Sequence, residues 1–275
     1  MNELLELLQY NFFQHALLGS LLASIACGII GTYIVTRRLV FISGGITHAS
    51  FGGIGIGLFY GISPILSAAI FSILSACGVE WLSKRSDMRE DSAIAVFWTF
   101  GMAVGIIFSF LTPGFTPDLT SFLFGNILTI TRPDIIQLAS VCLVLIAFFG
   151  IFLKQIVAIA FDREFALSQR LPVTFFEYLL MILIALTIVS CLRMVGIVLV
   201  ISLLTIPQMT ANLYTSSFKK IIWLSILIGY LGCLGGLAIS YKLQVPSGAS
   251  IIFIYIIFYI LSKLYKLITQ KEKEE

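Results

Sequence analysis

Charged residues are scarce in this sequence. Asp, Glu, Lys and Arg make up 11% of the 275 residues, hydrophobic residues make up 59%, and the mean hydropathy is +1.05. Soluble domains carry about a quarter charged residues, so this composition lies outside the soluble range. The formal net charge of +3 is too small to indicate an interaction with nucleic acid, and we expect no such partner.

The N-terminus lacks the cations of a cleavable signal peptide. It carries Glu3 and Glu6, and no Lys or Arg precedes Arg37. We therefore expect the first apolar run to stay in the mature protein. The residues before that run have the pattern of a short amphipathic stretch, which predicts an interfacial segment at 1–15.

Three kinds of chemical motif are also missing. The five cysteines are widely spaced in apolar runs without a C-x-x-C pair, which favours small packing residues over disulfides or structural zinc. No G-x-x-x-x-G-K-[ST] loop is present, so the chain cannot bind ATP in that way. No H-E-x-x-H motif or pair of aspartates lies in an apolar run, which argues against an embedded enzyme.

Acidic residues are absent from the centres of the apolar runs. Glu80 and Glu177 lie near the ends of two runs, where snorkelling, pairing with Lys84 or contact with a lipid headgroup is a sufficient explanation. Transporters driven by protons or sodium usually place carboxylates at membrane depth. Any uphill transport by this chain would therefore need energy from another subunit.

What the sequence does contain is a series of apolar runs, each long enough to cross a bilayer. They predict an all-α, polytopic transmembrane bundle forming one domain over residues 1–275. The connections at 61–64 and 192–196 are so short that eight or nine spans are both compatible with the pattern. The nine runs lie at 16–36, 45–61, 63–83, 92–112, 134–153, 175–192, 195–212, 219–240 and 249–267.

The distribution of cations predicts the orientation of these spans. If the N-terminus is outside, fourteen of the seventeen Lys and Arg residues fall on the cytoplasmic side. Only Arg132, Arg193 and Lys242 are then outside. Cytoplasmic loops carry the excess of Lys and Arg, so we predict an external N-terminus and a cytoplasmic tail at 268–275.

His48 is the one histidine inside a predicted span, and the span is rich in glycine. An ionisable group inside the membrane needs a polar partner, a water-filled path or a metal. Neutral imidazole binds first-row divalent ions, but a histidine that bonds a carbonyl between helices is the alternative interpretation. Because one histidine cannot hold a metal, a site would require His48 from two copies of a symmetric dimer.

Four segments carry a resemblance to a known family. Residues 37–50 read RRLVFISGGITHAS, 118–128 read DLTSFLFGNIL, 161–166 read FDREFA, and 195–207 read VGIVLVISLLTIP. Together they resemble the permeases of ATP-binding-cassette importers for zinc, manganese and iron(II), over nearly the whole chain. The resemblance implies a multi-pass protein of a bacterial inner (plasma) membrane.

The metal-site motif departs from the family pattern. Members typically carry an acid four residues before the histidine, where this chain has Gly44, and a glycine where it has Ser43. Only His48 is therefore carried over as a metal ligand. Loss of the carboxylate favours zinc or iron(II) over manganese by ligand type. Thr47 and Ser50 could orient an ion, although bonding to helix carbonyls is the more ordinary role for them.

The connection at 154–174 is the longest one expected on the cytoplasmic side. Asp162 can cap a short helix there, which either lies on the headgroups or, as the resemblance implies, is the coupling helix that docks on an ATPase. The family usually has glycine at the position of Arg170. Pro207 is expected to kink its span. The residues assigned to coupling are Phe161, Asp162, Glu164, Phe165, Ala166 and Leu171.

The resemblance implies a permease that conducts a divalent metal ion between two copies of itself. Its partners would be cytoplasmic ATP-hydrolysing subunits, an extracytoplasmic metal-binding protein, a second copy of the chain and membrane lipid. We expect no covalently bound cofactor and no enzymatic activity. A permease for a metal chelate, such as a siderophore or cobalamin, is the alternative.

Overall fold

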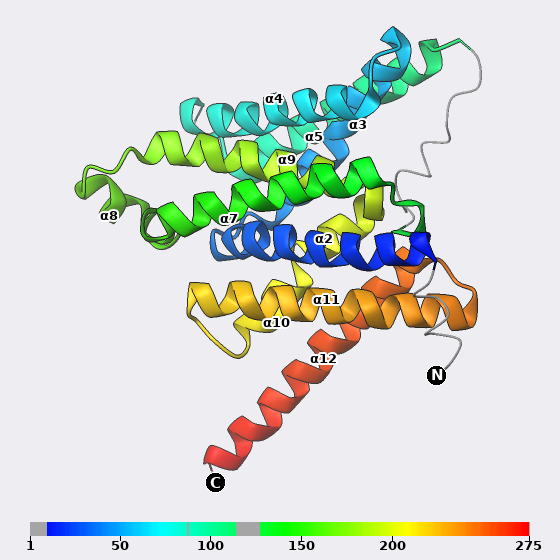
Figure 1. Cartoon of the computed structure of the whole chain (residues 1–275). Helices are drawn as coiled ribbons and strands as arrows, with labels where there is room; N and C mark the ends of the chain where they lie inside the picture. The colour runs from blue at the N-terminus through cyan, green and yellow to red at the C-terminus, as the bar shows by residue number, and fades with distance from the viewer. Residues whose placement is uncertain (1–9, 87, 114–126, 275) are drawn as a thin grey trace.

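The computed structural model describes residues 10–274 with the exception of 87 and 114–126, and this part of the chain contains helices and turns but no strand. Figure 1 shows most of the helices running side by side. They are α2 (Asn11–Thr36), α3 (Val40–Tyr60), α4 (Pro64–Arg85), α5 (Glu90–Leu111), the 3-10 turn η1 (Ile127–Thr129), α7 (Arg132–Phe161), α8 (Arg163–Ser168), α9 (Val173–Leu203), α10 (Ile206–Asn212), α11 (Phe218–Leu243) and α12 (Ser247–Glu274).

Nine helical segments within the described residues are long and apolar enough to cross a membrane, so the larger of the two expected span counts is confirmed. The sixth and seventh segments, Val173–Leu192 and Met194–Asn212, come from α9 and α10. The helices are generally longer than the apolar runs that the sequence indicated. Thus α3 begins at Val40, five residues before the predicted start at 45.

The helical backbone of α9 is interrupted at one glycine near the start of the seventh segment. Gly196 has φ 76° and ψ 168°, a conformation that is strained for any residue with a Cβ. A second interruption precedes α10, where Pro207 lies in the first turn. Pro207 cannot donate to the carbonyl of Leu203, and the Gln208 side chain donates to that oxygen instead at 3.0 Å. Pro207 therefore begins a new helix rather than kinking a continuous one.

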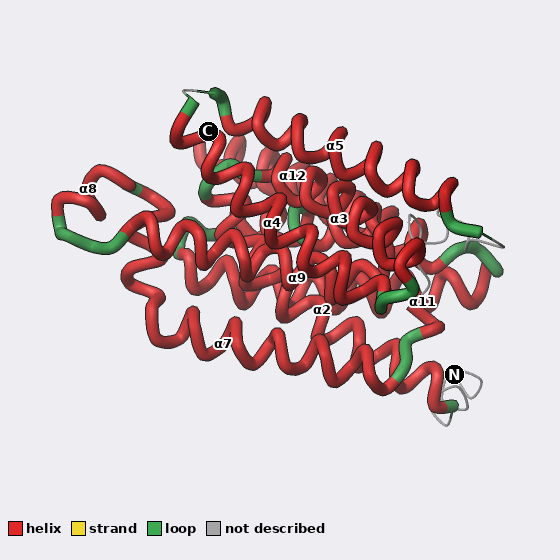
Figure 2. Tube along the Cα trace, turned by 90° about the horizontal axis from the view of Figure 1, so that it is seen from above, coloured by secondary structure: helices red, strands yellow, loops and turns green. Residues whose placement is uncertain are grey.

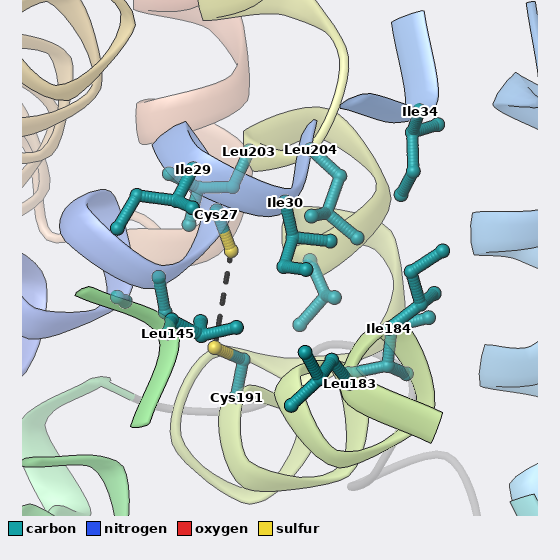
Figure 3. Close-up of a cluster of buried hydrophobic side chains, with 14 of the residues drawn as sticks. Cys27, Ile29, Ile30, Ile34, Leu145, Leu183, Ile184, Cys191, Leu203 and Leu204 are labelled. Carbon is teal, nitrogen blue, oxygen red and sulfur yellow. Dashed lines mark hydrogen bonds between the residues drawn. The ribbon is translucent and has the colours of Figure 1, made fainter. Parts of the chain in front are cut away.

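The core of the bundle is centred on α2, which packs against α7, α9 and α11. Figure 3 shows one part of this core, where isoleucine and leucine side chains of α2 and α9 interdigitate. The thiols of Cys27 and Cys191 lie 3.8 Å apart there, and neither is exposed. All five cysteines are free, four of them buried, which agrees with their expected role as packing residues.

Glycines bring α3 and α5 close together, as the glycine-rich sequence suggested. A Cβ on Gly55 would lie 2.5 Å from the carbonyl oxygen of Gly105, and one on Gly101 would lie 2.5 Å from Cα of Ala49. Since no real Cβ atom makes contacts this short, the backbones approach to a distance that only glycine permits. This close packing places α5 directly beside the helix that carries His48.

The two ends of the bundle carry different elements. In Figures 1 and 2, α8 and the end of α12 lie at one end. The start of α2 lies at the other end in Figure 1. Residues 11–15, expected in an interfacial segment, are the first turns of α2, and residues 1–9 lie outside the described part. The expected connection at 154–174 is shorter than predicted, because α7 runs to Phe161 and α9 starts at Val173. The tail at 268–275 continues α12 as a helix to Glu274.

Candidate functional site

His48 lies in the ninth position of α3, and its ring stacks on the indole of Trp98 from α5. The ring centroids are 4.5 Å apart and the planes differ by 5°. His48 and Trp98 are both half-buried, so one side of the pair is open while the other faces the bundle. An electron-rich indole face stabilises positive charge on a ring stacked against it, including the charge that an imidazole gains when it binds a metal ion.

The Nδ1 atom of His48 is buried and has no hydrogen-bond partner in the described structure. Buried polar atoms are rarely left without a partner, and such exceptions occur at sites that bind a water, an ion or a ligand. The hydroxyls around His48 are already committed to helix carbonyls. Thr47 donates to the oxygen of Ser43, and Ser50 donates to the oxygen of Thr47 at 2.6 Å. The carbonyl-bonded role considered for Thr47 and Ser50 is therefore confirmed.

Gly44 leaves a space one helical turn before His48. A Cβ placed on Gly44 would lie 3.8 Å from Cζ3 of Trp98 and 3.8 Å from Cδ1 of Ile201, which is ordinary van der Waals contact. A Cβ therefore fits at this position, on the same face of α3 as His48. The carboxylate of the resembling family is absent here, and the Trp98 indole borders the position.

The described part of the chain does not assemble a complete metal site. It contains no group of three or more His, Cys, Asp or Glu side chains placed to hold a metal ion. His48 alone offers one nitrogen ligand, whereas stable divalent sites use three or four ligands. A site at this position therefore needs ligands beyond the described residues of one chain.

The helix α8 is positioned by the cap that the sequence indicated. The Asp162 side chain accepts a hydrogen bond from the backbone N–H of Phe165 at 2.9 Å. Phe161 and Phe165 are 63% and 54% exposed and point away from the core, while Ala166 is buried. Leu171 packs partly against the same small core as Ala166. Of the residues assigned to coupling, Phe161, Glu164 and Phe165 thus present an exposed surface, and Ala166 with Leu171 anchors the connection to the bundle.

Arg170 ends α8 in the left-handed conformation, with φ 56°. Its N–H bonds the carbonyl of Leu167 at 2.9 Å, and the next N–H, that of Leu171, bonds the carbonyl of Ala166. This is the conformation that glycine adopts most readily after a helix. The connection therefore ends as a glycine-terminated helix would, although an arginine occupies the position.

An ion-pair cluster behind α8 was only partly expected from the sequence. Glu177 of α9 is 3% exposed and binds Nζ of Lys84 at 2.6 Å, Nε of Arg163 at 3.1 Å and Nη2 of Arg37 at 3.6 Å. Lys84 also binds Glu80 at 2.7 Å. Pairing with Lys84, one of the explanations that the sequence left open for Glu80 and Glu177, is confirmed. The contacts of Glu177 with Arg37 and Arg163 were not expected.

The sequence does not identify Trp98 as a site residue, because a tryptophan in an apolar run carries no positional signal. Its partnership with His48 depends on the packing of α3 against α5. The segment at 118–128, which contributed to the family resemblance, lies outside the described residues up to 126.

The fold and the site together define a class of protein: a polytopic all-α membrane protein with a capped surface helix at one end and a histidine within a glycine-rich span. The chain belongs to the ABC 3 transport family, whose model matches residues 9–266. It is 33% identical to a manganese transport system membrane protein, MntC, of Listeria innocua over 98% of this chain and 97% of that protein. It is 32% identical to a probable iron transport system membrane protein of Haemophilus influenzae over 95% of this chain and 96% of that protein.

A solved structure shares the architecture. A chain of PsaBC from Streptococcus pneumoniae, solved in complex with a Fab, superposes with a TM-score of 0.84 at 31% sequence identity. The match covers 95% of this chain and 94% of that chain. The chain is thus a multi-pass membrane protein with a fold found in its transport family.

Proposed function

We propose that this chain is the membrane-spanning permease of an ATP-driven importer for a divalent transition-metal ion. The observation that carries the proposal is the buried, unpartnered Nδ1 of His48 in a member of the ABC 3 transport family. Relatives of similar length and about one-third identity are named for manganese and iron transport, which supports a metal ion as cargo.

The ion passes between two copies of the chain. Each copy contributes one His48 imidazole near the dimer axis, so the pair offers two nitrogen ligands and no carboxylate from position 44. So few ligands bind the ion weakly, which suits a site that must release its cargo. Trp98 holds each imidazole in one orientation by stacking on it.

The exposed face of α8 is the docking surface for the ATP-hydrolysing subunit. Phe165 of α8 and Phe161, the last residue of α7, supply the apolar contact of the interface, and Glu164 supplies an exposed charge beside Phe165. Closure of two ATPase subunits would move the helices as rigid bodies and switch the open side of the dimer. An extracytoplasmic metal-binding protein delivers the ion, and the permease itself carries out no covalent chemistry.

The test is ATP-dependent uptake by proteoliposomes that contain the permease, its ATPase and its binding protein. Free zinc, manganese and iron(II) are compared with a siderophore chelate and cobalamin. We expect His48→Gln to reduce uptake of the preferred free ion by about tenfold or more, because loss of one ligand per copy removes interactions worth at least about 1.4 kcal/mol. The matched control is His15→Gln, which replaces the other histidine of the sequence; Nδ1 of His15 lies 3.3 Å from the carbonyl oxygen of Ile130.

Three results would contradict the proposal. Uptake of chelates in place of free ions would establish the alternative cargo. Uptake that is unchanged in His48→Gln would remove the histidine from the path. Equal losses in His15→Gln and His48→Gln would assign the effect to folding rather than to metal binding.

A further inference from the structure

The exposed surface helix and the candidate ion path are connected by one buried carboxylate. Glu177 is the fifth residue of α9, and its side chain is 3% exposed. Its three cationic partners come from three different parts of the chain: Arg163 from α8, Lys84 from the end of α4, and Arg37 from the turn between α2 and α3. Few residues elsewhere in the described bundle join so many elements.

Arg37 brings this cluster to the start of the helix that carries His48. It lies three residues before Val40, the first residue of α3, and its Nη1 also donates to the carbonyl of Ile159 in α7 at 3.4 Å. The cluster therefore joins α8 to the ends of α2, α4 and α7 and to the start of α9, and α3 begins three residues after Arg37. A displacement of α8 is transmitted to these elements through charge contacts as well as through the backbone.

The geometry of the cluster allows one contact to exchange while the acid remains paired. A buried carboxylate that loses its last cation is strongly destabilised. Glu177 keeps Lys84 at 2.6 Å and Arg37 at 3.6 Å if Arg163 withdraws with α8. Arg163 is the most exposed of the three cations, at 37%, and has Glu164 as a second partner at 3.6 Å. The Arg163–Glu177 contact is thus the one that can open without leaving a buried charge alone.

We propose that Glu177 is a positioning residue that links movement of α8 to movement of the helices around His48, with Arg163 as its exchangeable contact. This inference rests on the proposed function, because it assigns the route by which ATPase closure reaches the path. Glu177 touches neither the ion nor the ATPase. Its effect is therefore on the number of ions moved per ATP hydrolysed, not on metal affinity or on ATPase docking.

The first experiment measures hydrogen exchange in the purified permease alone. We expect the backbone amides of residues 163–168 to exchange at least about fivefold faster in Arg163→Gln than in wild type, the lower end of typical coupling between sites. Arg163→Lys should restore most of the protection. Unchanged exchange in Arg163→Gln would overturn the inference, whatever the complete complex transports.

The second experiment measures the ratio of metal ions transported to ATP hydrolysed in proteoliposomes. We expect Arg163→Gln and Glu177→Gln to lower this ratio at least about fivefold while ATP hydrolysis continues, since typical couplings are of this size. Arg163→Lys should recover the ratio. The control is Asp91→Asn, which removes an acid from an exposed pair with Arg89 at 3.7 Å.

The outcomes separate the two proposals. A wild-type complex that transports no free ion contradicts the proposed function, and hydrogen exchange then still decides the α8 link. A transporting wild type with an unchanged ratio in Arg163→Gln overturns the present inference only. If Glu177→Gln does not assemble, Arg163→Gln gives the decisive ratio, because the half-buried Arg163 is replaced without leaving Glu177 unpaired.

Discussion

Two positions determine the surroundings of the His48 ring: Trp98, whose indole contacts it, and position 44, where a glycine provides no side chain. Trp98 stacks on its ring at 4.5 Å, and Gly44 leaves a space one turn away. The stack limits rotation of the imidazole, and the glycine deprives the site of an oxygen ligand. The hard ions among the candidates prefer oxygen ligands, so this pair of residues favours softer metals at the proposed site.

Restoring an acid at position 44 should change metal preference. We predict that Gly44→Asp assembles and raises the preference for manganese over zinc by about tenfold, which corresponds to about 1.4 kcal/mol. The physical reason is an added carboxylate oxygen on the same face as His48. Competition between the two ions during uptake measures the effect.

The neighbouring glycine is a matched steric control. A Cβ on Gly45 would lie 2.3 Å from Cγ2 of Ile94, so Gly45→Asp should lower the thermal stability of the complex severely or prevent its assembly. The interpretation of the site would be wrong if Gly44→Asp transported normally with an unchanged order of metals. A Gly44→Asp variant as unstable as Gly45→Asp would show instead that the space is not available.

Among the elements, α8 shows the clearest contrast between an exposed face and a buried face. Its capping residue Asp162 and its exposed Phe165 were identified from the sequence, because capping is a local property. Phe161 was expected one turn before Phe165 on the same helix, but it is the last residue of α7, because the backbone of Asp162 is extended. The burial of Ala166 depends on the packing of α8 against α9 and α7, which no local pattern contains. The helix therefore has one face for a partner and one for the bundle.

The end of α8 is strained at Arg170, and relief of that strain should be measurable. Arg170 has φ 56°, where a residue with a Cβ is disfavoured by roughly 1–2 kcal/mol relative to glycine. We predict that Arg170→Gly raises the free energy of unfolding by about 0.5–1 kcal/mol, because glycine's greater freedom in the unfolded chain offsets part of the gain. Thermal unfolding in detergent provides the measurement.

Arg170→Ala separates strain from side-chain effects. It removes the guanidinium but keeps a Cβ in the left-handed conformation, so it should not be stabilising. If alanine stabilised the permease as much as glycine, the benefit would come from loss of the charge rather than from the backbone.

At the scale of the whole molecule, the nine candidate spans of the described residues predict that the start of α2 and the end of α12 lie on opposite sides of the membrane. The distribution of Lys and Arg predicts which side is which, with the N-terminus outside and α8 in the cytoplasm. The arrangement in Figure 1, with α8 and the end of α12 at the same end of the bundle, agrees with a common side for these two elements.

Labelling of two exposed serines tests this orientation. Ser63 lies between α3 and α4, and Ser216 lies between α10 and α11. In a Cys77→Ser background, in which the remaining native thiols are buried, we predict that Ser63→Cys reacts with a membrane-impermeant thiol reagent on intact cells. Ser216→Cys should react only after permeabilisation. The reverse pattern would invert the topology, and labelling of both on intact cells would contradict the number of spans.

The sequence by itself determined the features that depend on composition and local spacing. Scarce charge and long apolar runs predicted the helical spans, the Lys and Arg distribution predicted their direction, and four motifs predicted the transport family. These are properties of single segments, and the bilayer forces each apolar segment into a helix regardless of its neighbours.

Only the tertiary structure decided which distant segments meet. It interrupted α9 at Gly196, stacked Trp98 on His48, and joined Arg37, Lys84 and Arg163 around Glu177. Between helices in a membrane there is little hydrophobic driving force, so close packing of glycines and pairing of buried polar groups select the partners. Those contacts connect residues up to 140 positions apart, and the pattern within any one helix does not contain them.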